Sequence, residues 1–248
     1  MKFLKSVLIF FLFATTLVSA QEINQFDSNG KRHGVWKKNF EGTNVLRYEG
    51  AFEHGKELGL FKFYKNINNK SVLAATRNFS NDSDLAEVKF FNDKGKVISE
   101  GKMNGKVYVG IWKYYQNKSG KLLTLEHYDD EGNLHGERLV YYDNGQIAEK
   151  QNYKQGKLHG FSTWYSENNM VLKAFNYVNG DLHGSSKYYN PKGQLITEGL
   201  YKNGKKDGIW KFYENGKLIE EKDFTYVPKY IKKGDKYYKN PKKNKPLN

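Results

Sequence analysis

The sequence contains no cysteine among its 248 residues. This absence excludes disulfide bonds, thiolate zinc sites, thiol nucleophiles and thiol-based redox switches. It also excludes a lipid anchor attached through a modified cysteine. An exported protein without disulfides is more typical of a bacterial envelope than of a eukaryotic secretory pathway.

Long apolar runs are also scarce, and the one that occurs lies near Met1. Lys2 and Lys5 precede an apolar run over Val7–Val18, and Val18-Ser19-Ala20 has the small residues that a signal peptidase reads. This layout predicts a secretory signal peptide over residues 1–20. A helix of that length rises about 18 Å, short of the ~30 Å hydrocarbon core, so we expect no permanent membrane span. We therefore expect an exported protein, periplasmic or secreted and bacterial.

Acidic residues are few relative to basic ones: 27 Asp and Glu stand against 41 Lys and Arg, a net charge of +14. Residues 225–248 alone carry eight lysines and one aspartate. Tyrosines alternate with these lysines, and such interleaving is typical of binding to anionic surfaces. Lys232, Lys233 and Lys236 are therefore candidate binding residues for anionic envelope lipid or polysaccharide. Alternatively, the tail caps the edge of a sheet, where its lysines would prevent end-to-end pairing.

Proline is rare, with four residues, whereas 24 glycines, 19 tyrosines and 16 phenylalanines are present. Abundant aromatic residues and glycine predict β-hairpins rather than helices. A recurring glycine sets the period, and in the second half of the chain it returns every 24 or 26 residues. The glycines are Gly34, Gly59, Gly110, Gly136, Gly160, Gly184 and Gly208. The longer gap after Gly59 has room for a further unit near Ala86, so we expect about eight repeats over residues 34–224, after a lead-in over 21–33.

Each repeat is predicted to form two short antiparallel strands. Asn144-Gly145 and Asn215-Gly216 predict tight hairpin turns, because both central residues of such a turn need positive φ. Side by side, the hairpins would form an all-β meander, an elongated and curved single sheet. Residues 66–83 are rich in Asn and Ser, and we expect longer hairpin loops there.

Two aromatic rows recur in the repeats, and their tryptophans and tyrosines are the candidate binding residues of the predicted sheet. The first, two residues after the glycine, contains Trp36, Phe61, Trp112 and Trp210. The second, five residues after it, contains Tyr64, Tyr115, Tyr141, Tyr165, Tyr189 and Tyr213. Because side chains alternate along a strand, the two rows should lie on opposite faces. One row would pack inside the curve and the other would be presented to a partner, unless both serve only as core.

The cleanest copy, NGKKDGIWKFYENGKLIEEKDF over residues 203–224, resembles the MORN-type repeat in the variant found in bacterial YwqK-type proteins. Proteins of that type are often labelled as antitoxins of toxin–antitoxin systems. The resemblance covers residues 34–224. It implies a rolled antiparallel sheet without catalytic residues of its own. It also implies work by contact with protein or, for some MORN proteins, with lipid.

The polar side chains of the repeats do not suggest catalysis or a cofactor. His33, His135, His159 and His183 precede the repeat glycine, but equivalent places in neighbouring hairpins lie about 9–10 Å apart, too far to share one zinc ion. We therefore expect no metal site. Five carboxylates recur late in the unit, Glu100, Glu126, Glu149, Glu198 and Glu220. A row of equivalent carboxylates favours cross-strand pairing with lysine over acid–base catalysis.

We therefore hypothesise an exported, non-catalytic repeat protein that acts as a protein-interaction or scaffold module. An antitoxin-like or immunity-like inhibitor of a toxin is one alternative. Binding of carbohydrate or anionic lipid at the cell envelope is the other. Nucleic acid is not favoured as a partner, because export would remove the protein from it.

Overall fold

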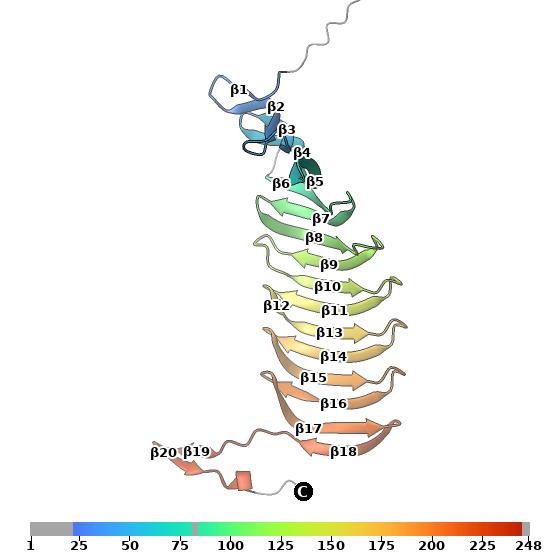
Figure 1. Cartoon of the computed structure of the whole chain (residues 1–248). Coiled ribbons are helices and arrows are strands. Elements are labelled where there is room, and N and C mark those ends of the chain that lie inside the picture. Colours follow the sequence, from blue (N-terminus) through green and yellow to red (C-terminus); the bar gives the residue numbers. More distant parts are fainter. Residues whose placement is uncertain (1–21, 81–83, 245–248) are drawn as a thin grey trace, which may run out of the picture.

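The computed structural model describes residues 22–80 and 84–244. The predicted signal peptide lies outside these residues. The described chain forms one antiparallel sheet of 18 strands and a separate two-stranded sheet. In Figure 1 the strands of the large sheet stack in sequence order into an elongated ladder. The predicted fold class is confirmed, because this single sheet is long, antiparallel and not closed.

Eight consecutive hairpins, here called units 1 to 8, build the ladder. Units 1 to 4 consist of β2 (Arg32–Asn39) with β3 (Leu46–Glu53), β4 (Lys56–Ile67) with β5 (Lys70–Phe79), β6 (Leu85–Phe91) with β7 (Val97–Asn104), and β8 (Val107–Tyr115) with β9 (Leu122–Tyr128). Units 5 to 8 consist of β10 (Gly136–Tyr141) with β11 (Ile147–Lys154), β13 (Gly160–Tyr165) with β14 (Val171–Val178), β15 (Asp181–Tyr189) with β16 (Leu195–Lys202), and β17 (Lys205–Glu214) with β18 (Lys217–Asp223). Short β12 (Lys157–Leu158) leads into unit 6, and short β1 (Gln25–Phe26) pairs with β2.

Tight two-residue turns join neighbouring units in the second half of the ladder. Gln155-Gly156, Asn179-Gly180 and Asn203-Gly204 have positive φ at both residues, the conformation that matches the twist of paired strands. Within units the prediction is right for Asn215-Gly216 but wrong for Asn144-Gly145. There only the glycine has positive φ, and the Tyr142 amide donates to the Gln146 carbonyl at 2.8 Å across a longer loop.

The expectation of long loops over residues 66–83 is also wrong for the part that the structure describes. β4 and β5 are longer than the usual strand here, with 12 and 10 residues, and their pairing continues to Ile67 opposite Lys70. Asn68 and Asn69 close the hairpin with φ of 51° and 59°. Asparagine tolerates this left-handed conformation, so a run of asparagines forms a tight turn without glycine.

The core lies where one unit meets the next, on the side we call the aromatic face. The Trp112 ring of unit 4 lies flat over Gly101 of unit 3, where an added Cβ would be 2.5 Å from Cδ2 of the ring. The Trp112 indole Nε1 donates to the Lys102 carbonyl at 2.9 Å. The ladder shifts register at this glycine, and the indole satisfies a carbonyl beside the bulge. Trp112 and Trp210 are both 0% exposed.

The same arrangement recurs at two other junctions: Phe61 covers Gly50, and Trp210 covers Gly199. At the junction of units 6 and 7 the sizes are reversed. Phe175 of unit 6 pairs with Ser186 of unit 7. At each of these four junctions one large ring lies over a small residue of the facing strand. In the last unit Lys222 pairs with Trp210 at the place that a glycine takes in unit 7.

The tail forms its own hairpin rather than a further rung. β19 (Tyr230–Lys233) and β20 (Lys236–Lys239) pair only with each other in the described structure, and a 3-10 turn (Pro241–Asn244) follows. Figure 1 shows this hairpin standing away from β18. Neither strand therefore extends the large sheet as the expected edge strand. At the other end, the lead-in does extend the large sheet, because β1 pairs with β2 as a short edge strand. The ring centroids of Phe26 and Trp36 lie 5.1 Å apart there.

Candidate binding surfaces of the sheet

The face opposite the aromatic face, here called the lysine face, carries a lysine in six of the eight units. Each lysine directly follows a residue that lies on the aromatic face between two units. Because side chains alternate along a strand, the lysine points to the opposite face. These are Lys37, Lys62, Lys89, Lys113, Lys187 and Lys211. Tyr64, Tyr115 and Tyr213 lie on the same face, because their hydroxyls donate to glutamates paired with those lysines. The prediction that the tryptophan and tyrosine rows point to opposite faces is confirmed at these units.

The glutamates belong to Glu-Gly dipeptides at the three junctions with a ring over glycine. Because side chains alternate, the glycine accepts the ring on one face while the glutamate reaches the lysine face. Glu100 accepts a hydrogen bond from Tyr115 at 2.6 Å and lies 3.2 Å from the Lys89 ammonium. Glu49 and Glu198 make the equivalent contacts with Tyr64 and Tyr213. The predicted lysine pairing is confirmed for Glu100 and Glu198.

These contacts shift pKa values in opposite directions. The Tyr115 hydrogen bond, helped by Lys89, lowers the pKa of Glu100 below its usual 4.5. Burial, with the Glu100 carboxylate beside it, raises the pKa of Tyr115 to about 12. Both groups therefore keep, at neutral pH, the charge state that the hydrogen bond needs. The carboxylates are held as ionised acceptors.

We expect the free energy of unfolding to fall as acid protonates Glu100. A carboxyl whose pKa is lowered by folding stabilises fully above its unfolded pKa of 4.5, and this contribution is lost as pH falls through the folded value. Tyr115→Phe should cost about 1 kcal/mol at pH 7 and make the acid-side slope of stability shallower in urea titrations. Tyr189→Phe is the matched control, because Ala174 stands 15 residues before it, as Glu100 stands before Tyr115. An equal change of slope in both variants would contradict the assignment.

Exposed apolar side chains also line the lysine face, and we call them the apolar row. Its members are Leu60 (52% exposed), Ile111 (51%), Phe161 (67%), Leu200 (52%) and Ile209 (54%). Four of them directly follow the repeat glycine. Leu200 pairs with Ser185, which occupies that same position after Gly184. Leu200 and Ile209 line a shallow groove of about 190 Å³ beside Lys187, Glu198 and Lys211. Exposure of these apolar side chains to water is unfavourable, so the row is a candidate contact surface.

The structure divides the sequence-predicted binding residues between both faces and the tail. Trp36 is half-buried on the aromatic face, and Trp112 and Trp210 have no exposed surface, so a ligand could reach those two rings only if the junction opened. Tyr141, Tyr165 and Tyr189 are half-buried at the bulged position that Tyr115 occupies in unit 4. Lys232, Lys233 and Lys236 are exposed on the separate hairpin.

Sequence reasoning missed the apolar row, although its period was visible beside each repeat glycine. It also missed a charged cluster at the junction of units 4 and 5. There Arg138 replaces the ring and lies 3.0 Å from Glu126 and 3.5 Å from Glu149. Arg138 also donates to Gln151 at 3.1 Å, and Tyr128 donates to Glu126 at 2.7 Å. Glu126 and Glu149 were expected to pair with lysine; they bind arginine on the aromatic face instead.

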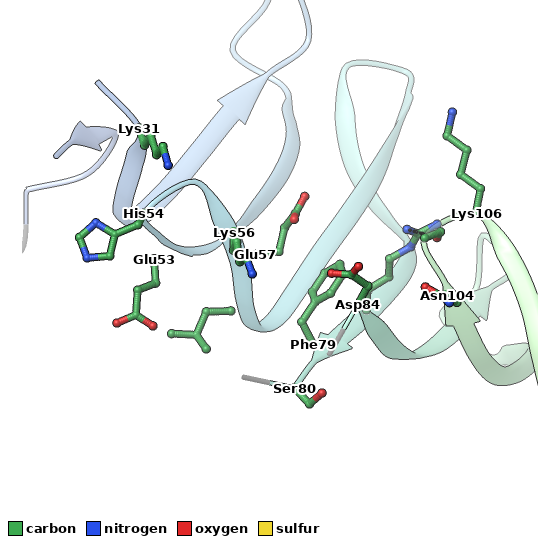
Figure 2. A pocket seen from close by; sticks show the side chains of 13 residues that line it. Lys31, Glu53, His54, Lys56, Glu57, Phe79, Ser80, Asp84, Asn104 and Lys106 are labelled. Atoms are coloured by element: carbon green, nitrogen blue, oxygen red, sulfur yellow. Dashed lines mark hydrogen bonds between the residues drawn. The ribbon is translucent and has the colours of Figure 1, made fainter. Parts of the chain in front are cut away.

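A hollow of about 980 Å³ lies at the turn side of units 1 to 4 (Figure 2). Its lining mixes Lys56, Glu57, Arg77 and Asp84 with the ring of Phe79. In the close-up, His54 and Lys106 stand at opposite sides of the view. Asp27 binds His54 at 2.7 Å, and this hydrogen bond lowers the pKa of Asp27 to about 2. The polar groups do not converge on one point, so we assign no ligand to the hollow.

The repeat histidines are placed separately along the ladder. The His33 and His54 rings are tilted against each other with centroids 5.1 Å apart, and Nδ1 of His135 lies 4.0 Å from the Asp129 carboxylate. Within residues 22–80 and 84–244, no three His, Asp or Glu side chains are grouped so that they could hold a metal ion. In the same part of the chain, no helix is long and apolar enough to cross a membrane.

The family model of the MORN repeat variant matches residues 134–155, 182–203 and 206–225. These segments coincide with units 5, 7 and 8. Repeats of this kind commonly mediate interactions with proteins or membrane lipids. The comparison does not confirm the finer resemblance to the YwqK-type antitoxin-like proteins. A search of curated proteins found no match.

Among solved structures, the chain is similar to S. aureus TarM, seen as a mutant in complex with fondaparinux, α-GlcNAc-glycerol and UDP. That match has 18% identity and a TM-score of 0.28, and it covers 40% of this chain and 19% of that one. A second TarM structure matches with 18% identity, a TM-score of 0.27 and coverages of 39% and 19%. A Bacteroides fragilis protein of unknown function matches with 12% identity, a TM-score of 0.16 and coverages of 71% and 96%. The chain thus spans about a fifth of the TarM chains.

Proposed function

We propose that this protein is an exported, non-catalytic interaction module that binds a protein partner through the apolar row of its lysine face. One observation carries the proposal: five aliphatic or aromatic side chains, each more than half exposed, repeat along a single face. Apolar side chains gathered in this way and rimmed by charged residues are characteristic of protein-binding surfaces. Export rests on the signal-peptide pattern of residues 1–20.

The sheet holds this row ready for binding. Phe161 lies in the middle of the row, and the Asn152 side chain donates to its backbone carbonyl at 3.0 Å. An exposed aromatic residue on a rigid strand loses little conformational freedom when it is buried by a partner. Binding therefore needs no rearrangement of the ladder. Phe161 is the expected anchor of the interface.

The charged groups beside the row favour contact over catalysis. Glu49 and Glu198 each accept a tyrosine hydroxyl and lie near lysines, and these contacts lower the pKa of Glu49. A general acid would need a raised pKa. Such ion pairs on a flat face instead give charge complementarity around an apolar centre.

Site-specific photo-crosslinking in the producing cell tests the proposal. A benzophenone amino acid at Phe161 should yield a discrete polypeptide adduct, whereas the same probe at exposed Glu220, which pairs with Phe212 of the aromatic face, should not. With the purified partner, Phe161→Asp should weaken binding about 30-fold, the effect of a central hot spot. Equal adducts at both positions, or unchanged affinity, would contradict the assignment.

The identity of the adduct separates the alternatives. A partner enzyme whose toxicity falls when this protein is added would make the module immunity-like. A glycan adduct in place of a polypeptide would replace protein binding by carbohydrate binding.

A further inference from the structure

We propose that the C-terminal hairpin, β19 with β20, is a separate docking element for anionic phospholipid surfaces. This would be a second ligand site beyond the proposed function, in a segment outside the eight units that carry the apolar row. The hairpin is independent of the ladder in its pairing: its four rungs join Tyr230 to Lys239, Ile231 to Tyr238, Lys232 to Tyr237 and Lys233 to Lys236.

The register places lysine and tyrosine alternately on one face. Residues that pair directly across an antiparallel hairpin share a face. Tyr230, Lys232, Tyr237 and Lys239 therefore lie together, each lysine opposite a tyrosine. All four are exposed, and Tyr237 is 70% exposed. A two-stranded sheet has no second layer to cover these tyrosines, so their rings are available to another surface.

The charge of the segment selects the kind of surface. Residues 229–242 contain six lysines and one acid, Asp235 at the hairpin turn. On the ladder, by contrast, lysines such as Lys89 and Lys187 have glutamate partners at 3.2 and 3.7 Å. The hairpin thus carries a concentrated positive charge, whereas these ladder lysines are paired with carboxylates.

Lysine and tyrosine together match the chemistry of a membrane interface. Each lysine near an anionic leaflet contributes a favourable interaction within a Debye length. Tyrosine prefers the headgroup level, where its ring meets acyl chains and its hydroxyl stays wet. The chain of residues 224–229 between β18 and β19 separates the hairpin from the ladder (Figure 1). A membrane bound at the hairpin would therefore contact a segment that is distinct from the lysine face of the ladder.

Vesicle co-sedimentation of the full chain tests the proposal. Phosphatidylcholine vesicles containing phosphatidylglycerol should bind the protein, and vesicles of phosphatidylcholine alone should not. Replacing Lys232 and Lys239 by Gln should weaken binding about 25-fold, because each lysine contributes about fivefold. The control replaces exposed Lys192 and Lys217 by Gln, which removes the same charge from a loop and a strand end of the ladder. It should change binding less than about threefold.

Two further results decide between a membrane and another polyanion. In Tyr237→Trp the new indole should show a blue-shifted emission with anionic vesicles, relative to the unsubstituted protein, and no such shift with a soluble single-stranded oligonucleotide. Equal loss of vesicle binding in the two lysine variants would overturn the proposal, as would tighter binding to the oligonucleotide. Crosslinking at Phe161 is unaffected by either outcome, so the protein-binding proposal is tested independently.

Discussion

Gly101→Ala is expected to lower the free energy of unfolding by about 3 kcal/mol, because overpacking a filled site costs 1–3 kcal/mol and sometimes more. The new methyl group would lie 2.5 Å from Cδ2 of Trp112, a ring that has no exposed surface into which it could move. Displacing the ring would also break the bond from its indole nitrogen to the Lys102 carbonyl. Urea unfolding followed by tryptophan fluorescence measures the change.

A neighbouring substitution and a compensated pair make this test specific. Lys102→Ala changes an exposed side chain one residue away and should stay within about 0.5 kcal/mol. At the junction of units 7 and 8, Gly199→Ala should destabilise in the same way. Gly199→Phe combined with Trp210→Ser reproduces the Phe175–Ser186 pairing of the preceding junction and should be more stable than Gly199→Phe alone. If the double variant is no better, pairing one large with one small residue does not stabilise the junctions.

Arg138→Met is expected to destabilise the middle of the ladder by about 2–3 kcal/mol, because it leaves two carboxylates without their cation. Glu126 and Glu149 lie on either side of Arg138, and the Glu126 side chain is only 14% exposed. Methionine keeps much of the side-chain volume, so the loss reports charge and hydrogen bonding rather than a cavity. Thermal unfolding of the purified protein is the measurement.

A second substitution separates charge from shape in this cluster. Adding Glu126→Gln to Arg138→Met removes one of the unpaired charges and should recover about half of the loss. The matched control, Lys150→Met, affects a surface pair with Glu137 and should cost less than about 1 kcal/mol. If Arg138→Met costs no more than this control, the cluster does not stabilise the junction.

The junctions explain how an irregular repeat forms a regular ladder. Rings over glycine stabilise three junctions, an arginine with two carboxylates stabilises a fourth, and a phenylalanine opposite serine stabilises a fifth. Each solution fills the same space between two units. Stability is therefore a sum of contacts between neighbouring units, as expected for a repeat protein. The β18 edge ends this series with Lys222, whose ammonium lies 5.5 Å from the Phe224 ring.

The sequence alone was sufficient for the repeat, the antiparallel ladder and the two opposed aromatic rows. The spacing of the glycines is local information, and alternation along a strand follows from covalent geometry. Local reasoning failed at Asn68-Asn69 and at Asn144-Gly145, because the length of a hairpin loop depends on the register of its strands. The mixed composition of residues 66–83 was compatible with either a loop or a long hairpin until pairing was known.

Only the tertiary structure decided which side chains are buried and which are presented. Trp112 and Phe161 are both aromatic residues close to a repeat glycine, Trp112 two residues after Gly110 and Phe161 one residue after Gly160, yet one is 0% and the other 67% exposed. A one-residue difference in position reverses the face, and the glycine of the preceding unit then determines whether a ring can be enclosed. The pairing of Arg138 with two glutamates and the independence of the C-terminal hairpin were likewise decided by contacts between units and strands. Those contacts join residues that are distant in sequence, and composition and period do not encode them.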